Sequence, residues 1–248
     1  VKKNVESNNV IGLPTETVYG LAANAYSDKS VKKIFKLKKR PVLNPLIIHF
    51  KNLKDLKKDA ICNNSFIKLY KTLCPGPITF ILNKNPKSKI SKIANAGKKT
   101  IAVRFPKHRV ARSLLKILNV PLAAPSANIS SKLSPTCASD VVDEFGSKIK
   151  FILDGGQCKI GLESTIIDLT DEPTILRQGV ITSKEIYKFP ITKRNNLFSY
   201  PKELENKLSE FIYKTIKKNS DRWGIFLADG NTIFGVSHIL LEDEDGEH

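Results

Sequence analysis

Short apolar segments of four to six residues, separated by amphipathic stretches, are the feature that most constrains the fold of this chain. Apolar runs of this length are typical of buried strands, and apolar residues spaced three and four apart are typical of helices that bury one face. The two kinds of element mix without strict alternation, which favours an α/β or α+β domain built on a mixed sheet. Strands are predicted at 9–13, 46–50, 78–82, 100–105, 121–125, 151–154, 164–169 and 174–177.

Four amphipathic helices are predicted among these strands. The first is expected to have Asp28 as its N-cap and to stop before Pro41, because the residue that precedes a proline avoids the helical conformation. The second is expected to begin at Ser65, and Ser134 with the proline after it is expected to open the fourth. The inward faces are predicted to hold Val31, Ile34, Phe35 and Lys38, then Phe66, Leu69, Tyr70 and Leu73, then Val110, Leu114, Ile117 and Leu118, and finally Ala138, Val141, Val142 and Phe145.

The character of the sequence changes near residue 190. Residues 1–190 are predicted to form the main domain, and the polar residues 191–200 fit a linker. The remaining segment, 201–248, is predicted to hold a helix from Pro201, a strand over 223–228 and a turn at Asp229-Gly230, followed by an acidic end. A segment this short has little material for a core of its own, so it is predicted to be an appendage.

The chain is strongly basic, with 41 Lys and Arg against 24 Asp and Glu and a formal net charge of +17. A charge of this size is informative about partners and solubility rather than about the fold. Two interpretations stay open. One is a phosphate-bearing partner, either a nucleotide or RNA, and the other is a lysine-rich solvated surface that reflects coding bias.

Targeting, membrane and metal motifs do not stand out. The four cysteines are widely spaced and form no C-x-x-C pair, so they give no support to a zinc or redox site. The first residues contain no apolar signal-like stretch, and no window approaches the apolar length of a membrane span. We therefore expect a cytoplasmic protein that is not embedded in a membrane.

Glycine-rich phosphate-binding motifs are also missing, so a nucleotide would have to be bound by another device. Lys38 and Arg40 lie at the predicted end of the first helix, just before Pro41. Two cations at a helix exit can converge on a polyphosphate. The alternative is that they interact only with the dipole at the helix C-terminus.

Polar residues end several of the predicted strands. Thr15–Thr17 follow the first strand, and Ser126 and Asn128 follow the PLAAP strand, at the kind of position where open α/β sheets bind ligands. Each group could instead make only local turn hydrogen bonds. His49 lies in an apolar strand and is either a core residue or a ligand-binding one. Arg104 interrupts an alternating strand, so it either faces solvent or pairs with an anion such as a carboxylate.

Taken in order, these motifs resemble those of the YrdC/Sua5 family, the threonylcarbamoyl-AMP synthases. The resemblance runs from about residue 10 to residue 183 and includes the family's K-x-R and S-x-N pairs at Lys38, Arg40, Ser126 and Asn128. It implies a twisted mixed sheet with flanking helices around a basic cavity, and it leaves 201–248 either as an appendage or as a remnant of a Sua5 domain. The matching blocks are LPTETVYGLAANA (13–25), KKRPVLNPLIIH (38–49), PGPITFIL (75–82), TIAVRFP (100–106), PLAAPSANIS (121–130), LSPT (133–136), ILDGGQCKIGLESTIIDLT (152–170) and ILRQG (175–179).

The resemblance implies a nucleotidyltransferase. L-Threonine combines with bicarbonate or CO2, the resulting carbamate attacks the α-phosphate of ATP, and pyrophosphate leaves. A separate threonylcarbamoyl transferase then passes the group to an adenosine of tRNA. ATP is thus a substrate, Mg²⁺ is expected to be carried on its triphosphate, and no metal site made of protein ligands is expected.

The resemblance also implies a set of ligand-binding residues. Lys38 and Arg40 are expected to act in catalysis, because they supply positive charge where the transition state and pyrophosphate gather negative charge. Arg104 is expected to pair with the carboxylate of L-threonine. The full threonine set is Thr17, His49, Arg104, the backbone at Ala124, and Ser164, and the ATP set is Arg40, Asn44, Thr100, Ser126, Asn128, Ser134 and Arg177.

The alternative hypothesis is an RNA-binding protein without adenylate-forming activity, whose basic cavity takes double-stranded or structured RNA. The net charge and the missing nucleotide motifs favour it, whereas the lack of a base-stacking signature disfavours it. Weak binding of tRNA or double-stranded RNA would also be compatible with the enzyme.

Overall fold

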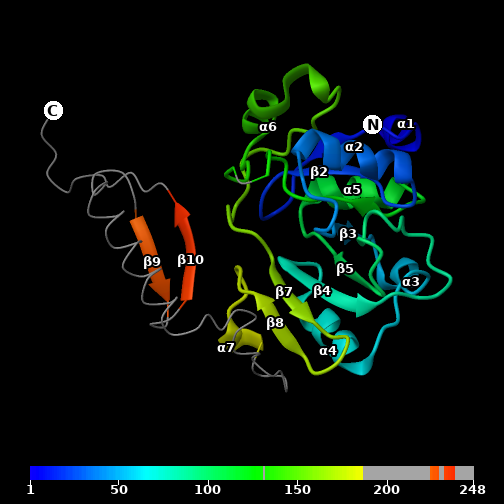
Figure 1. The fold of residues 1–248 in the computed structure, drawn as a ribbon, viewed down its shortest axis with the longest axis vertical. Coiled ribbons are helices and arrows are strands. Elements are labelled where there is room, and N and C mark those ends of the chain that lie inside the picture. Colours follow the sequence, from blue (N-terminus) through cyan, green and yellow to red (C-terminus); the bar gives the residue numbers. More distant parts are fainter. Residues whose placement is uncertain (131, 187–223, 229–231, 238–248) are drawn as a thin grey trace, which may run out of the picture. The chain divides into compact units, whose positions relative to one another are not determined.

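The first compact unit of the chain is built on one mixed sheet. The computed structural model describes residues 1–130, 132–186, 224–228 and 232–237, and the chain divides into the units Val1–Asn195 and Asn196–His248. The sheet of the first unit has eight strands in the order β1-β2-β6-β3-β5-β4-β7-β8 (Figure 1). This confirms the predicted mixed α/β fold. The strands are β1 (Ile11–Leu13), β2 (Gly20–Asn24), β3 (Ile47–His49), β4 (Ile78–Asn83), β5 (Thr100–Arg104), β6 (Leu122–Ala123), β7 (Thr165–Asp168) and β8 (Thr174–Arg177).

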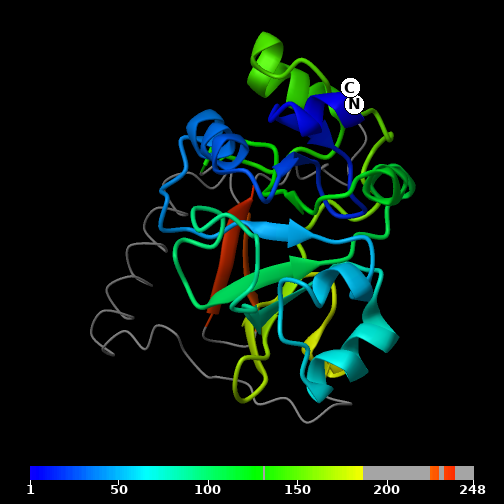
Figure 2. The same ribbon diagram turned by 90° about the vertical axis from the view of Figure 1, so that its right-hand side faces the viewer.

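Helices bury the sheet in two places and so make two cores. Around β1 and β2, residues of α1 and α5 join Ile11, Leu13 and Ala22 in one cluster of buried side chains. Around the central strands, Phe66 of α4 packs edge-on against Phe80 of β4, with ring centroids 5.1 Å apart. Figure 2 shows α3 and α4, in cyan, together on one side of these strands. The helices are α1 (Lys2–Glu6), α2 (Asp28–Lys38), α3 (Leu53–Leu56), α4 (Asn64–Leu73), α5 (Arg109–Ile117), α6 (Ala138–Phe145) and α7 (Ser183–Ile186), with a 3-10 turn at Gly146–Lys148.

The register of the sheet brings residues far apart in sequence into one row. His49 of β3 is paired with Arg104 of β5, and Arg104 is paired with Thr79 of β4. Thr79 is paired in turn with Ile166 of β7, which is paired with Arg177 of β8. Directly opposed residues of neighbouring strands share a face. The row therefore presents His49, Arg104 and Arg177 on the same side of the sheet.

Several helix boundaries differ from the sequence-based expectation. Ser27, not Asp28, is the N-cap of α2 and accepts a hydrogen bond from the Ser30 amide. Asn63, not Ser65, caps α4, and its side chain accepts from the Phe66 amide. The predictions were wrong because several consecutive polar residues can cap a helix, and the extended backbone at Ser27 and Asn63 decides which one does. The fourth helix begins at Ala138 rather than beside Ser134.

The predicted inward positions of two residues and one predicted strand were also wrong. Ile117 and Val142 are exposed, because each lies at the edge of the apolar stripe of its helix. The segment 151–154 forms only an isolated bridge between Ile152 and Gly12 rather than a strand. Conversely, β2 was missed, because its Gly- and Ala-rich sequence has little strand propensity.

The second unit contributes one described element pair. Strands β9 (Gly224–Ala228) and β10 (Thr232–Ser237) are antiparallel neighbours, in line with the strand predicted at 223–228. The predicted helix from Pro201 and the turn at Asp229-Gly230 lie outside the described residues. The boundaries of 1–190, 191–200 and 201–248 stay a prediction.

Candidate active site

A small cavity lies on the open side of the row formed by His49, Arg104 and Arg177. The family resemblance implied five residues for one amino-acid ligand, and all five line this cavity, together with two of the residues implied for a nucleotide. The five are Thr17, His49, Arg104, Ala124 and Ser164, and the two are Ser126 and Arg177. These residues come from strands β3, β5 and β8 and from three loops, and they meet at one place.

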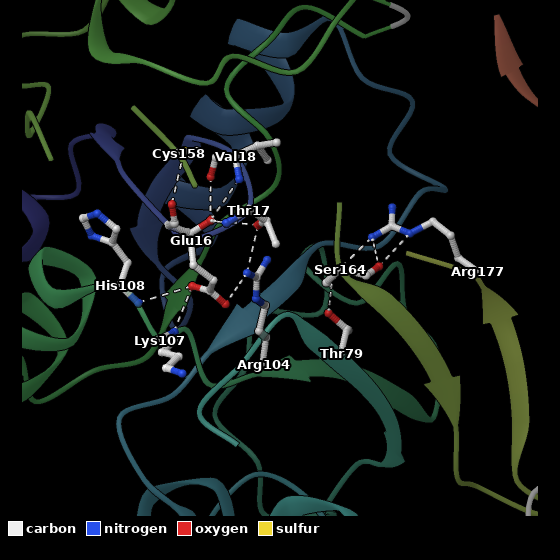
Figure 3. A network of polar contacts seen from close by, with 11 residues as sticks. Glu16, Thr17, Val18, Thr79, Arg104, Lys107, His108, Cys158, Ser164 and Arg177 are labelled. Carbon is white, nitrogen blue, oxygen red and sulfur yellow. Dashed lines mark hydrogen bonds and ion pairs between the residues drawn. The ribbon is translucent and has the colours of Figure 1, made fainter. Parts of the chain in front are cut away.

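Arg104 is buried and held by a network from the segment after β1 (Figure 3). Its Nη2 donates to Glu16 Oε1 at 2.8 Å and to Thr17 Oγ1 at 2.9 Å. The other oxygen of Glu16 accepts from the amides of Lys107 and His108. Burial raises the pKa of Glu16, but Arg104 and the backbone amides of Glu16 and Lys107 more than offset it and leave the pKa lowered. The carboxylate therefore stays charged and fixes one side of the guanidinium.

Arg104 retains unused hydrogen-bonding capacity on its remaining side. Its Nε is buried and has no hydrogen-bond partner among the described residues. A buried N–H without a partner costs free energy unless a ligand or water accepts from it. Arg104 was expected either to face solvent or to pair with an anion, and the structure gives it Glu16 as the anion.

His49 is the second buried group with unused hydrogen-bonding capacity. Both ring nitrogens are buried and lack a partner within the described part of the chain. Burial, and then the nearby charge of Arg104, lower the pKa of His49 to about 3. The ring is therefore neutral near pH 7 and offers one donor and one acceptor. Of the two interpretations of His49, the ligand-binding one gains support from these free nitrogens.

The buried, neutral state of His49 predicts a pH dependence of stability. The folded protein protonates His49 only near pH 3, whereas the unfolded chain does so near pH 6.5. The unfolded state then binds more protons between these values, so stability should fall as pH drops below 6.5. From pH 7 to pH 5 we expect a loss of about 2 kcal/mol from this residue. Urea unfolding of wild type and His49→Gln measures it, and an equal loss in both proteins would refute the expectation.

Arg177 closes the opposite side of the cavity (Figure 3). Its Nε and Nη2 donate to the carbonyl of Ser164, at 3.1 and 2.9 Å. The hydroxyl of Ser164 is 2.8 Å from that of Thr79, on the neighbouring strand. Arg177 Nη1 forms an ion pair with Glu163, whose second oxygen accepts from Ser134 at 3.2 Å. Glu163 therefore occupies the position where Arg177 and Ser134 could together bind an anion.

Lys38 lies beneath the cavity rather than in it. Its side chain is buried, and Nζ donates to the carbonyls of Ser126 and Asn128 at 2.6 Å each and to Asn128 Oδ1 at 3.2 Å. An ammonium has three donors, so the binding capacity of Lys38 is used within the protein. The Asn128 amide also donates to the carbonyls of Ile129 and Lys132. Lys38 and Asn128 thus shape the loop that presents Ser126.

Arg40 is partly free, at the end of α2. Its Nε and Nη2 donate to the carbonyls of Asn44 and Pro45. Asn44 is exposed, and its position follows from the turn that begins at Pro41. Burial is the main cause of a lowered pKa at Arg40; Glu163 opposes it and Arg177 adds to it, so the field of both residues reaches Arg40.

Thr100 is set apart from the other predicted ATP residues. It begins β5, four positions before Arg104, and it is not among the residues that line the cavity. The parallel pairing of Ile47 with Ala102 places the start of β5 beside the segment that precedes β3, which is the segment held by Arg40. Thr100 is therefore nearer to the Arg40 turn than to Arg104.

Two carboxylates of the site were missed by sequence reasoning, Glu16 and Glu163. Each neighbours a predicted hydroxyl, at Thr17 and Ser164, and for Glu16 the expected pairing of Arg104 with an anion was a further signal. Their importance comes from the arginines that they pair with, at 104 and 177, and such pairing is visible only in the fold.

Metal and membrane features complete the description. In the ranges that the structure describes, no group of three His, Cys, Asp or Glu residues is arranged to hold a metal ion. None of the helices in these ranges has the length and apolar character that a membrane crossing requires.

Comparisons with known proteins identify the family to which this chain is similar. A family model for Sua5, YciO and YrdC proteins, described as "Telomere recombination", matches residues 3–179. The chain is 45% identical over 189 residues to a threonylcarbamoyl-AMP synthase of Pyrococcus abyssi, covering 74% of this chain and 54% of the relative. It is 41% identical over 201 residues to a threonylcarbamoyl-AMP synthase of Schizosaccharomyces pombe, covering 71% of this chain and 49% of the relative.

A solved structure agrees with these matches. The crystal structure of P. abyssi Sua5 complexed with L-threonine is similar with a TM-score of 0.76 and 34% identity, covering 92% of this chain and 77% of that chain. The chain spans about half the length of the curated relatives it matches.

Proposed function

The chain belongs to the Sua5/YciO/YrdC family, and on that premise we propose that it is a threonylcarbamoyl-AMP synthase. In this reaction the amine of L-threonine takes up bicarbonate or CO2 to form a carbamate. A carbamate oxygen then attacks the α-phosphate of ATP, and the bond to pyrophosphate breaks. The observation that carries the proposal is the convergence of Thr17, His49, Arg104, Ala124 and Ser164 on one cavity.

The unused hydrogen-bonding groups of this cavity suit an amino acid. The free Nε of Arg104 is the natural donor to a carboxylate, because a charged donor in a buried site forms the stronger hydrogen bonds. Neutral His49 can donate to or accept from a hydroxyl or an amine without adding charge. The hydroxyls of Thr17 and Ser164 are already fixed by Arg104 and Thr79, so they would present fixed rather than rotating oxygens.

ATP would bind on the side of Arg40 and Arg177, and its triphosphate would meet Glu163. Glu163 pairs with Arg177 and accepts a hydrogen bond from Ser134. A phosphate group carries more charge than a carboxylate and accepts from the same donors. Binding is therefore expected to move Glu163 off Arg177. The proposed ATP set is Arg40, Asn44, Thr100, Ser126, Asn128, Ser134 and Arg177, with Mg²⁺ carried on the triphosphate.

The proposal also covers the co-substrate, the enzyme that uses the product and the domain organisation. Bicarbonate or CO2 supplies the carbamate carbon, and a threonylcarbamoyl transferase acting on tRNA consumes the product in the cytoplasm. Residues 1–190 are proposed as the catalytic domain, with 201–248 as a short remnant of a second domain. The RNA-binding alternative fits less well, because Glu16 and Glu163 neutralise the two arginines of the cavity.

The test is release of pyrophosphate from ATP by the purified chain, with and without L-threonine and with and without bicarbonate. Release that requires both additions supports the proposal. A folded protein that releases none under any condition contradicts it, and steeply salt-dependent RNA binding would then favour the alternative.

Arg40→Ala is expected to lower this activity about 100-fold, because one lost donor to a phosphoryl transition state is typically worth roughly 3 kcal/mol. Arg40 has unused donors, unlike Lys38, so its loss should act on the reaction rather than on folding. Lys36→Ala, an exposed lysine of the same helix, is the matched control. Full activity of Arg40→Ala would remove Arg40 from the proposed mechanism.

A further inference from the structure

A second and larger cavity lies at the other end of the two central strands. Its volume is about 570 Å³, in the range of sites for small molecules. It forms where β4 ends at Asn83 and β5 begins at Thr100, a pair four residues along from Thr79 and Arg104, or about 13 Å along the strands. None of its lining residues belongs to the proposed threonine or ATP sets.

The lining of this cavity is basic and has no acidic member. Four lysines contribute to it, Lys84, Lys92, Lys98 and Lys99, and none of them forms an ion pair in the described part of the chain. Asp59, a carboxylate whose charge acts on Lys84, is engaged by the hydroxyls of Tyr26 and Ser88. Burial, and then Lys92, lower the pKa of Lys84, so the charges are close enough to repel each other. An anion placed among them would relieve that repulsion.

Asn95 has a buried acceptor atom, and a phosphate ion that only accepts hydrogen bonds would leave this atom without a partner. This side chain is 2% exposed and lines the cavity. Its Nδ2 donates to the carbonyls of Lys98 and Thr100, which fixes the orientation of the amide. Its Oδ1 is then a buried acceptor without a partner among the described residues. Such an atom requires a donor, for example a ribose hydroxyl or a base amine.

The cavity also has an apolar part. Ile61 is 53% exposed although it lies beside the end of β4, where its amide donates to the carbonyl of Asn83. With Pro86 it offers a surface on which a flat ring can rest. Lysines for phosphate, an acceptor for a donor group and an apolar platform are the three features of a nucleotide site.

We propose that this cavity, lined by Lys84, Lys92, Lys98, Lys99 and Asn95, binds a nucleotide that carries two or more phosphates. The lysines hold the phosphates, Asn95 Oδ1 accepts from the sugar or the base, and Ile61 packs against the ring. The cavity borders Thr100 of the proposed ATP set, whose carbonyl accepts from Asn95, but none of its lining residues belongs to either substrate set. We therefore assign it an effector rather than a reactant.

The experiment is calorimetric titration of the full chain with GDP and, separately, with inorganic pyrophosphate. We expect GDP to bind more tightly than pyrophosphate, because pyrophosphate leaves Asn95 and Ile61 without a partner. The triple variant Lys92→Gln/Lys98→Gln/Lys99→Gln should weaken GDP binding at least tenfold. These three side chains are exposed, so the variant is expected to fold normally.

The matched control is Lys29→Gln/Lys32→Gln/Lys116→Gln, which removes the same charge from exposed positions outside the cavity and should leave GDP binding unchanged. Equal GDP affinity in the wild type and the cavity variant, equal losses in both variants, or no GDP binding at millimolar concentration would each overturn the proposal. Pyrophosphate binding as tight as GDP would overturn the nucleoside part. Because the readout is binding of GDP and not release of pyrophosphate from ATP, its failure leaves the proposed synthase activity untouched.

Discussion

Replacing Arg104 by glutamine is expected to lower pyrophosphate release about 1,000-fold and to weaken L-threonine binding to a similar extent. Arg104 is the only cation among the five residues of the proposed threonine set, and it is 4% exposed. Glutamine keeps a donor at this position but loses the charge that would balance a substrate carboxylate. Titration with L-threonine measures the binding, and the pyrophosphate assay measures the turnover.

The same substitution should also cost stability, because it leaves the buried carboxylate of Glu16 without its cation. Removal of one partner from a buried ion pair typically costs about 3–5 kcal/mol. The double variant Glu16→Gln/Arg104→Gln removes both charges and should recover part of that loss in urea unfolding, yet bind L-threonine no better than the single variant. Recovery of threonine binding in the double variant, or normal binding in Arg104→Gln, would show that Arg104 serves only to neutralise Glu16.

Much of the fold follows from local pattern in the sequence. Alternating and uniformly apolar runs predicted β4, β5 and β7, since one face of these strands packs against a core. The failures have physical causes as well. Strand β2 is rich in glycine and alanine and joins the sheet through its neighbours, so tertiary pairing overrides a weak local preference.

The candidate site was predictable as a list of residues but not as an arrangement. The sequence marks His49 and Ser126 as polar residues at or beside strands. It does not contain the register that pairs His49 with Arg104, because that register depends on which strands become neighbours. The helical spacing predicts Lys38 on the inward face of its helix, but it does not identify the acceptors of Lys38, which lie 88 and 90 residues further along the chain.

Because Lys38 holds the loop of Ser126 and Asn128, its replacement is expected to affect both stability and activity strongly. Lys38→Met is expected to destabilise the protein by about 3 kcal/mol, because it leaves the carbonyls of Ser126 and Asn128 buried without their shared donor. The pyrophosphate assay should show a loss of about 100-fold, through displacement of the loop that carries Ser126. Urea unfolding gives the stability, and amide hydrogen exchange over 126–130 reports on the loop directly.

These measurements distinguish two roles for Lys38, positioning the loop or contacting phosphate. As a positioning residue it acts through the loop, so activity and loop protection should fall together, and exposed Lys36→Met on the same helix should change neither. As a residue that contacts phosphate it would have to release one of its three acceptors when ATP binds. Lys38→Met would then lose more activity than the changes in stability and in exchange over 126–130 account for. The burial of Lys38 favours the first outcome, because this residue is 1% exposed and all three donors of its ammonium are used by Ser126 and Asn128.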